Sequence, residues 1–131
     1  MPTRSKADSR ENQTINLEGL NKIKSKNKKN RLIKLVTEII GRYNPEMVYL
    51  FGSYARGSNK MHSVIDILII GETDLRFIQR IKEILHLSRG KITISPLFYT
   101  SDEFELLKKN NDGFIASVLD DAKILYKKAV R

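Results

Sequence analysis

Two short stretches, separated by ten residues, carry side chains that suit phosphate and metal chemistry. The first is Gly52-Ser53, which directly follows the apolar run Met47–Phe51. A glycine at this point lets the backbone approach a ligand closely, and the Ser53 hydroxyl with the first amides of a following helix suits a phosphate group. Arg56, one turn further on, could add a charge-assisted hydrogen bond to the same phosphates.

The second stretch is Val64 to Ile70, a β-branched run interrupted by a single carboxylate, Asp66. A carboxylate is costly to bury without a partner, which makes Asp66 the most informative residue of the chain. Two interpretations stay open from the residues alone. Asp66 is either a functional carboxylate or a structural one that caps a backbone group or pairs with Arg56.

The elements that position these residues follow from hydrophobic periodicity and from capping and turn residues. Helical spacing predicts four longer helices, and a short helix follows Gly52. The first runs from Leu32 to about Tyr43, with Asn30 as its N-cap, and the second runs from a cap at Thr73 or Asp74 to about Leu87. The third runs from Ser101 to Lys109, with Ser101 as its N-cap and without a capping box. The fourth is Phe114 to Leu119. Strands are expected at 47–51, 64–70 and 91–100, with Pro96 marking an edge strand. Residues 122–126 fit either a last helix or a strand.

This order predicts an α/β (α+β) domain, a small mixed sheet of three to four strands flanked by helices. The chain divides by charge: residues 1–31 hold nine Lys/Arg and three Asp/Glu, while residues 32–131 hold fifteen and twelve. We therefore expect a basic, flexible leader at 1–30, with a linker at 24–31, and a folded domain at 31–131. A basic leader of this kind can contact nucleic acid.

Composition excludes several kinds of site. The chain has no cysteine and only two histidines, His62 and His86, so disulfides and thiolate or histidine-rich zinc sites are not expected. His62 is expected to be exposed in a loop and His86 to lie at a helix end. No run reaches the roughly 18 apolar residues of a membrane span, and the N-terminus lacks an apolar signal core. We therefore expect a cytoplasmic protein.

The stretch LFGSYARG, the ten-residue spacing and the following IDILII together resemble the nucleotidyltransferase superfamily that includes DNA polymerase β. The chain is most similar to its small prokaryotic single-domain type, often the antitoxin partners of HEPN-domain proteins, and the resemblance covers residues 32–128. It implies binding of a nucleoside triphosphate, with ATP expected, together with Mg²⁺. It also implies transfer of a nucleoside monophosphate to a hydroxyl acceptor. The implied nucleotide-binding residues are Gly52, Ser53 and Arg56, and the implied catalytic and metal-binding residue is Asp66.

The chain departs from the family pattern at two of its three acidic positions. Val64 stands where the first aspartate belongs, and the expected third position on strand 91–100 offers Thr93, Ile94 and Ser95. One carboxylate with substrate phosphates can bind a single Mg²⁺ weakly, but a two-metal clamp needs bridging acids. We therefore expect impaired transfer activity. The alternative is a catalytically inactive member that binds a protein partner, as an antitoxin does.

Overall fold

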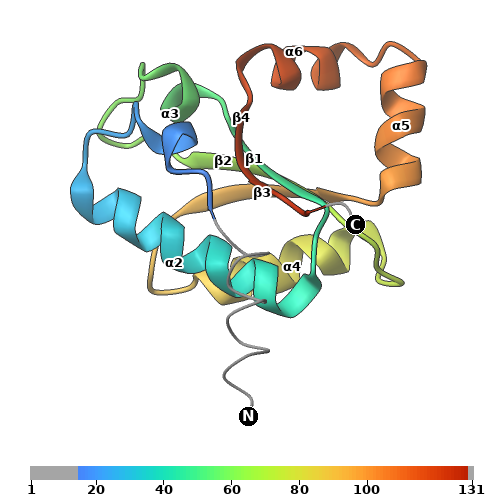
Figure 1. The fold of residues 1–131 in the computed structure, drawn as a ribbon, viewed down its shortest axis with the longest axis horizontal. Coiled ribbons are helices and arrows are strands. Elements are labelled where there is room, and N and C mark those ends of the chain that lie inside the picture. Colours follow the sequence, from blue (N-terminus) through green and yellow to red (C-terminus); the bar gives the residue numbers. More distant parts are fainter. Residues whose placement is uncertain (1–14, 130–131) are drawn as a thin grey trace.

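The computed structural model describes residues 15–129. A four-stranded sheet has helices on both faces (Figure 1). The strands are β1 (Met47–Phe51), β2 (Ile65–Ile70), β3 (Ile94–Tyr99) and β4 (Lys123–Lys127). The helices are the 3-10 turn η1 (Leu17–Leu20), α2 (Lys26–Tyr43), α3 (Ser53–Arg56), α4 (Phe77–Ser88), α5 (Ser101–Lys109) and α6 (Gly113–Asp121). The predicted fold class is confirmed, and residues 122–126 belong to a strand.

The sheet has the order β3-β2-β1-β4 and is mixed. β1 runs antiparallel to both neighbours, while β2 and β3 are parallel. β3 lies at an edge, as Pro96 predicted, because a proline has no amide hydrogen for a strand on that side. No helix within residues 15–129 is both long and apolar enough to cross a membrane.

Each face of the sheet has its own apolar core. The alternation of β2 sends Ile65, Ile67 and Ile69 to one face, where they pack with α2 and α4. Leu68 and Ile70 point to the other face, where they pack with residues of α5 and α6. Figure 1 shows these two helix pairs on opposite sides of the strands. Asp66 has the parity of Leu68, so it belongs to the α5–α6 face.

The first long helix begins earlier than predicted. We expected a linker at 24–31 and a helix from Leu32, but α2 starts at Lys26, where the Ser25 hydroxyl accepts the Lys28 amide at 3.2 Å. Lysine is a good helix former, so this basic run continues the helix once it is capped. The C-terminal stop agrees with expectation, because Asn44 adopts the left-handed conformation of a helix C-cap.

Residues 15–23 pack on the domain and belong to its folded part. Leu20 and Ile23 are 1% and 2% exposed within the α2–α4 core. The Asn16 amide donates to the Leu125 carbonyl at 2.7 Å, and its side chain donates to the Ile124 carbonyl at 3.1 Å. This segment therefore covers the outer edge of β4. Of the predicted leader, residues 1–14 lie outside the described part of the chain.

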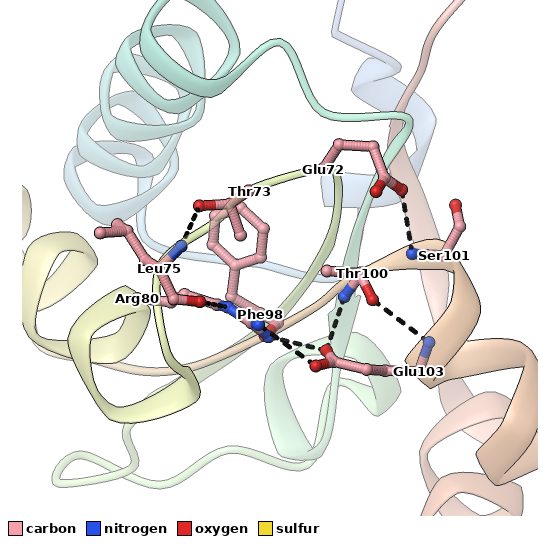
Figure 2. Close-up of polar contacts among 8 residues, drawn as sticks. All are labelled: Glu72, Thr73, Leu75, Arg80, Phe98, Thr100, Ser101 and Glu103. Carbon is pink, nitrogen blue, oxygen red and sulfur yellow. Dashed lines mark hydrogen bonds and ion pairs between the residues drawn. The ribbon is translucent and has the colours of Figure 1, made fainter.

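A polar cluster joins α4, β3 and α5 (Figure 2). Arg80 is buried at 6% exposure and forms a two-pronged ion pair with Glu103, at 2.7 and 3.2 Å. Its remaining contacts go to the Leu75 and Phe98 carbonyls, at 2.8 and 3.1 Å. Arg80 thus ties three consecutive elements together.

Two sequence expectations in this region are wrong. Thr100, not Ser101, is the N-cap of α5, and Glu103 then occupies the third helical position and completes a capping box. Helix α4 begins at Phe77 rather than near Asp74, and its buried residues are Arg80, Ile84 and Ser88. Helical spacing predicts that Ile84 points inward together with Leu75, Phe77, Ile78, Ile81 and Leu85. Ile84 is buried, as predicted, but Ile78 and Leu85 are 59% and 42% exposed.

Candidate functional site

The candidate site begins at a backbone turn that only glycine can make comfortably. Gly52 connects β1 to α3 with φ +75° and ψ −156°, a conformation closed to residues with a side chain. A Cβ atom added there would lie 2.3 Å from Oδ2 of Asp66. The absence of a side chain at Gly52 therefore lets the Asp66 carboxylate lie against the turn.

Strand pairing brings Asp66 to this place. Asp66 is in register with Phe51 on β1 and with Ser95 on β3. Because Phe51 is the last residue of β1, its neighbour Gly52 is beside the carboxylate. The pairing of β1 with β2 thus brings together Gly52 and Asp66, two predicted site residues that are distant in the sequence.

The Asp66 carboxyl is half-buried, and this burial raises its pKa above the usual value. The positive charge of Arg56 acts in the opposite direction but is the smaller effect. A carboxylate kept partly out of water without enough compensating charge gains from a cation or from a hydrogen-bond donor. The electrostatics of Asp66 therefore favour binding of a positively charged group at this turn.

Arg56 lies at the end of α3, where its Nη1 donates to Oδ2 of Asp121 at 2.8 Å. Both side chains are partly exposed, so this pair is weak and open to exchange. One structural interpretation of Asp66 is that it pairs with Arg56. No direct contact between these two side chains supports it, since Arg56 pairs with Asp121. Arg56 remains within electrostatic reach of Asp66 and could turn toward a phosphate.

Ser53 is the first residue of α3, half-buried beside the turn. The Ala55 and Arg56 amides both donate to the Gly52 carbonyl, at 3.0 and 3.1 Å. Those two amides are thus used within the turn. The groups that remain for a phosphate are the Ser53 hydroxyl and the earlier amides of the turn.

Two positions near Asp66 are acidic in the family pattern but not in this chain. Val64 precedes β2 and is 37% exposed, and Ser95 is the β3 residue paired with Asp66. Within residues 15–129 no cluster of three or more His, Asp or Glu side chains could enclose a metal ion. Among the described residues, Asp66 is therefore one carboxylate that could hold a single Mg²⁺, without the bridging acids of a two-metal clamp.

Asp121 is the residue at this site that sequence reasoning missed. It lies at the end of α6, 65 residues after its partner Arg56, and no local pattern marks it. His62 is exposed and His86 lies in the last turn of α4, as expected. Neither histidine adds a base to the turn.

The chain is similar to several known proteins. The family model described as "Polymerase beta, Nucleotidyltransferase" matches residues 33–131. The chain is 37% identical over 79 residues to a protein of Methanocaldococcus jannaschii described as a candidate protein adenylyltransferase. That match covers 60% of this chain and 76% of the relative.

Two solved structures share the fold. A nucleotidyltransferase-like protein from Sulfolobus solfataricus superimposes with a TM-score of 0.50 at 22% identity, covering 79% of this chain and 90% of that one. A structure described as a toxin-antitoxin with AMP-PNP gives a TM-score of 0.52 at 25% identity, with 76% and 73% covered. With the family model matching about three-quarters of its length, the chain belongs to the polymerase β-type nucleotidyltransferase family.

Proposed function

We propose that this protein binds a nucleoside triphosphate, ATP in the first instance, with Mg²⁺ at the Gly52 turn. It would transfer the nucleoside monophosphate slowly to a hydroxyl acceptor. The observation that carries this proposal is the Asp66 carboxylate lying against Gly52, a phosphate-suited turn. The relative described as a candidate protein adenylyltransferase supports ATP as the nucleotide.

Each residue has a distinct role in this proposal. Gly52 and Ser53 would contact the phosphates through the backbone and the hydroxyl, and Arg56 would exchange Asp121 for a phosphate oxygen. Asp66 would hold the metal. Bound Mg²⁺ would neutralise phosphate charge and orient the α-phosphate. The acceptor oxygen would bond to the α-phosphorus as pyrophosphate leaves.

The proposed activity is slow because the supporting acids are missing. Val64 and Ser95 provide no negative charge to share a metal with Asp66. The lost charge stabilisation corresponds to several kcal/mol, or a rate lower by roughly a thousandfold or more than with a complete acid set. Nucleotide binding needs fewer ligands than transfer and would persist.

The test is calorimetric titration of the protein with Mg²⁺–ATP. We expect binding that weakens several-fold in Asp66→Asn, whereas Asp74→Asn, at an exposed position far from the turn in sequence, behaves like the natural protein. Val64→Asp places a second carboxylate two residues before Asp66 at a part-exposed site and should tighten binding while turnover stays poor. No binding at millimolar ATP would end the nucleotide proposal, and fast transfer by the natural protein would show that other residues hold the metal.

A second candidate is a catalytically inactive member that acts through a protein partner, as an antitoxin does. Its support is the similarity to the toxin-antitoxin structure, together with the two missing acids. A neighbouring gene for a small helical HEPN-type protein, and co-purification of the two chains, would favour it. If Asp66→Asn abolishes ATP binding but leaves that complex intact, the partner function does not depend on the nucleotide.

A further inference from the structure

A concave site lies where the beginnings of β2 and β3 meet α2 and α4. It is a cavity of about 660 Å³ enclosed by the first turns of α2, the end of α4, the loop at 61–64 and the segment 89–94. Ile65 and Ile94 form part of its wall and belong to the α2–α4 core. Asp66, with the opposite strand parity, faces α5 and α6. Neither Gly52 nor Asp66 lines the cavity, but Tyr54 of α3 and Val64 do, so the cavity adjoins the Gly52 turn without including it.

Positive charge dominates this cavity. Its walls carry four permanent cations, Lys28, Arg31, Arg89 and Lys91, and none of the described residues that line it is Asp or Glu. Lys91 pairs with Glu38 at 2.6 Å, which neutralises one of the four. About three positive charges remain around one concave space, an arrangement that favours an anion carrying several charges.

Two of the cations are held in place by neutral partners. Nζ of Lys28 donates to the Tyr54 hydroxyl at 2.7 Å, and Nη1 of Arg31 donates to the Lys91 carbonyl at 2.8 Å. These bonds orient the cationic groups without cancelling their charge. Their positions are fixed before a ligand arrives, which lowers the ordering cost of binding.

The end of α4 does not oppose an anion here. A helix C-terminus normally presents carbonyl oxygens with partial negative charge. In this turn the Leu85 carbonyl accepts the Ser88 hydroxyl at 2.8 Å, and the Ser88 carbonyl accepts the Lys91 and Ile92 amides at 2.9 and 3.2 Å. These carbonyls already accept hydrogen bonds, and their partial negative charges are smaller than the full positive charges of the surrounding arginine and lysine side chains.

We infer that this cavity binds a small ligand that carries several phosphate groups. Its volume lies within the range of small-molecule sites, and the planar forks of Arg31 and Arg89 suit phosphate oxygens. The observations favour a small ligand over a nucleic-acid strand. Among the described lining residues, two have ring side chains. Tyr54 is 1% exposed and offers no face for base stacking, and His62 is a single exposed imidazole, which does not form a stacking platform for successive bases.

The test measures binding of inorganic tripolyphosphate to the full chain without Mg²⁺. Calorimetry gives the affinity, and changes in amide chemical shifts locate the site. We expect the shifts to map to residues 28–31 and 89–93, with at least a tenfold loss of affinity in R31Q/R89Q. The matched control R42Q/R76Q removes the same charge at exposed positions outside the cavity and should change affinity less than twofold. If R31Q/R89Q does not fold, R89Q alone replaces it. The Arg89 side chain forms no hydrogen bond within residues 15–129, so this single change should not disturb folding. We expect R89Q to lose about threefold in affinity for tripolyphosphate.

Three results would overturn the inference. Shifts confined to Gly52, Ser53 and Arg56, none of which lines the cavity, would place the anion at the proposed nucleotide turn instead and leave that proposal standing. Equal losses in the two double variants would mean a general attraction to a basic protein. Tighter binding of a single-stranded oligonucleotide without terminal phosphates, lost in R31Q/R89Q or on deletion of residues 1–14, would indicate a strand or the leader rather than a small ligand at this cavity.

Discussion

Gly52 and Asp66 depend on each other sterically. The carboxylate occupies the space that a side chain at residue 52 would need, and the left-handed φ of Gly52 adds backbone strain for any other residue. The same two features place the carboxylate where phosphates would bind. Gly52 is therefore needed both for the stability of the turn and for the proposed function.

We expect Gly52→Ala to destabilise the fold by about 1–3 kcal/mol, because the new Cβ must displace the carboxylate and the backbone is strained. The matched control is Gly41→Ala, on an exposed position of α2 where nothing lies within 4 Å of the added atom. That change should be neutral or stabilising by up to about 1 kcal/mol. Urea unfolding of both variants checks the pair. Equal effects would contradict the steric argument.

The ionised Asp66 carboxylate should lower the free energy of unfolding at neutral pH. Burial raises its folded pKa, so the folded protein holds the proton more tightly than the unfolded chain does. The free energy of unfolding therefore falls as pH rises from the usual value of 3.8 through the folded pKa. Asp66→Asn should be more stable than the natural protein above that interval and lose the advantage below it.

Unfolding midpoints at neutral pH and below pH 3.8 measure this difference. Because the same variant is expected to lose affinity for Mg²⁺–ATP, a gain in stability with a loss of binding would mark Asp66 as a functional carboxylate. A loss of stability at neutral pH would instead support the structural interpretation, in which the ionised carboxylate stabilises the fold.

At the level of elements, the α4–β3–α5 connection depends on Arg80. This arginine is buried while the carboxylate of Glu103 is partly exposed, and the hydrogen bonds from Arg80 are the largest cause that lowers the Glu103 pKa (Figure 2). The capping box of α5 uses the same glutamate. One side chain therefore fixes a helix start and a helix-to-helix contact.

We expect Arg80→Met to destabilise the fold by about 2–3 kcal/mol, because the Leu75 and Phe98 carbonyls lose their donor in a buried region. Glu103→Gln should cost less. Its cost should depend on pH: the lowered pKa means that Glu103 stabilises the fold above the ordinary glutamate pKa and stops doing so as pH falls through the folded pKa. Unfolding curves at neutral and acidic pH test this, and a cost of Glu103→Gln that is the same at both would exclude the ion pair as the cause.

The sequence predicted the elements near the site well and the cluster at Arg80 poorly, for physical reasons. Strands β1 and β2 are short apolar runs bounded by Gly52 and Gly71, with Asp66 as the one polar residue of β2, so their existence follows from local pattern. The burial of Arg80 requires a carboxylate from another helix, which periodicity cannot reveal. The capping box could have been found, since Thr100 and Glu103 have the required spacing once the helix start moves by one residue.

Over the whole molecule, the largest difference from expectation is the role of the N-terminal segment. Its charge predicted a flexible leader up to residue 30. Leu20 and Ile23 nonetheless fill the α2–α4 core, and Asn16 adds hydrogen bonds to β4. Sparse apolar residues are sufficient here because the sheet already offers an open edge and a preformed core.

This assignment predicts a large effect from a small change in a region that charge alone would mark as dispensable. Ile23→Ala should destabilise the protein by about 2–4 kcal/mol, because it empties a site that is 2% exposed. Leu17→Ala, only six residues earlier and 63% exposed, should change stability by less than about 0.5 kcal/mol. Urea unfolding of the full chain separates the two. Similar, small effects of both would mean that residues 15–23 are not part of the cooperative fold, and that the domain begins with α2.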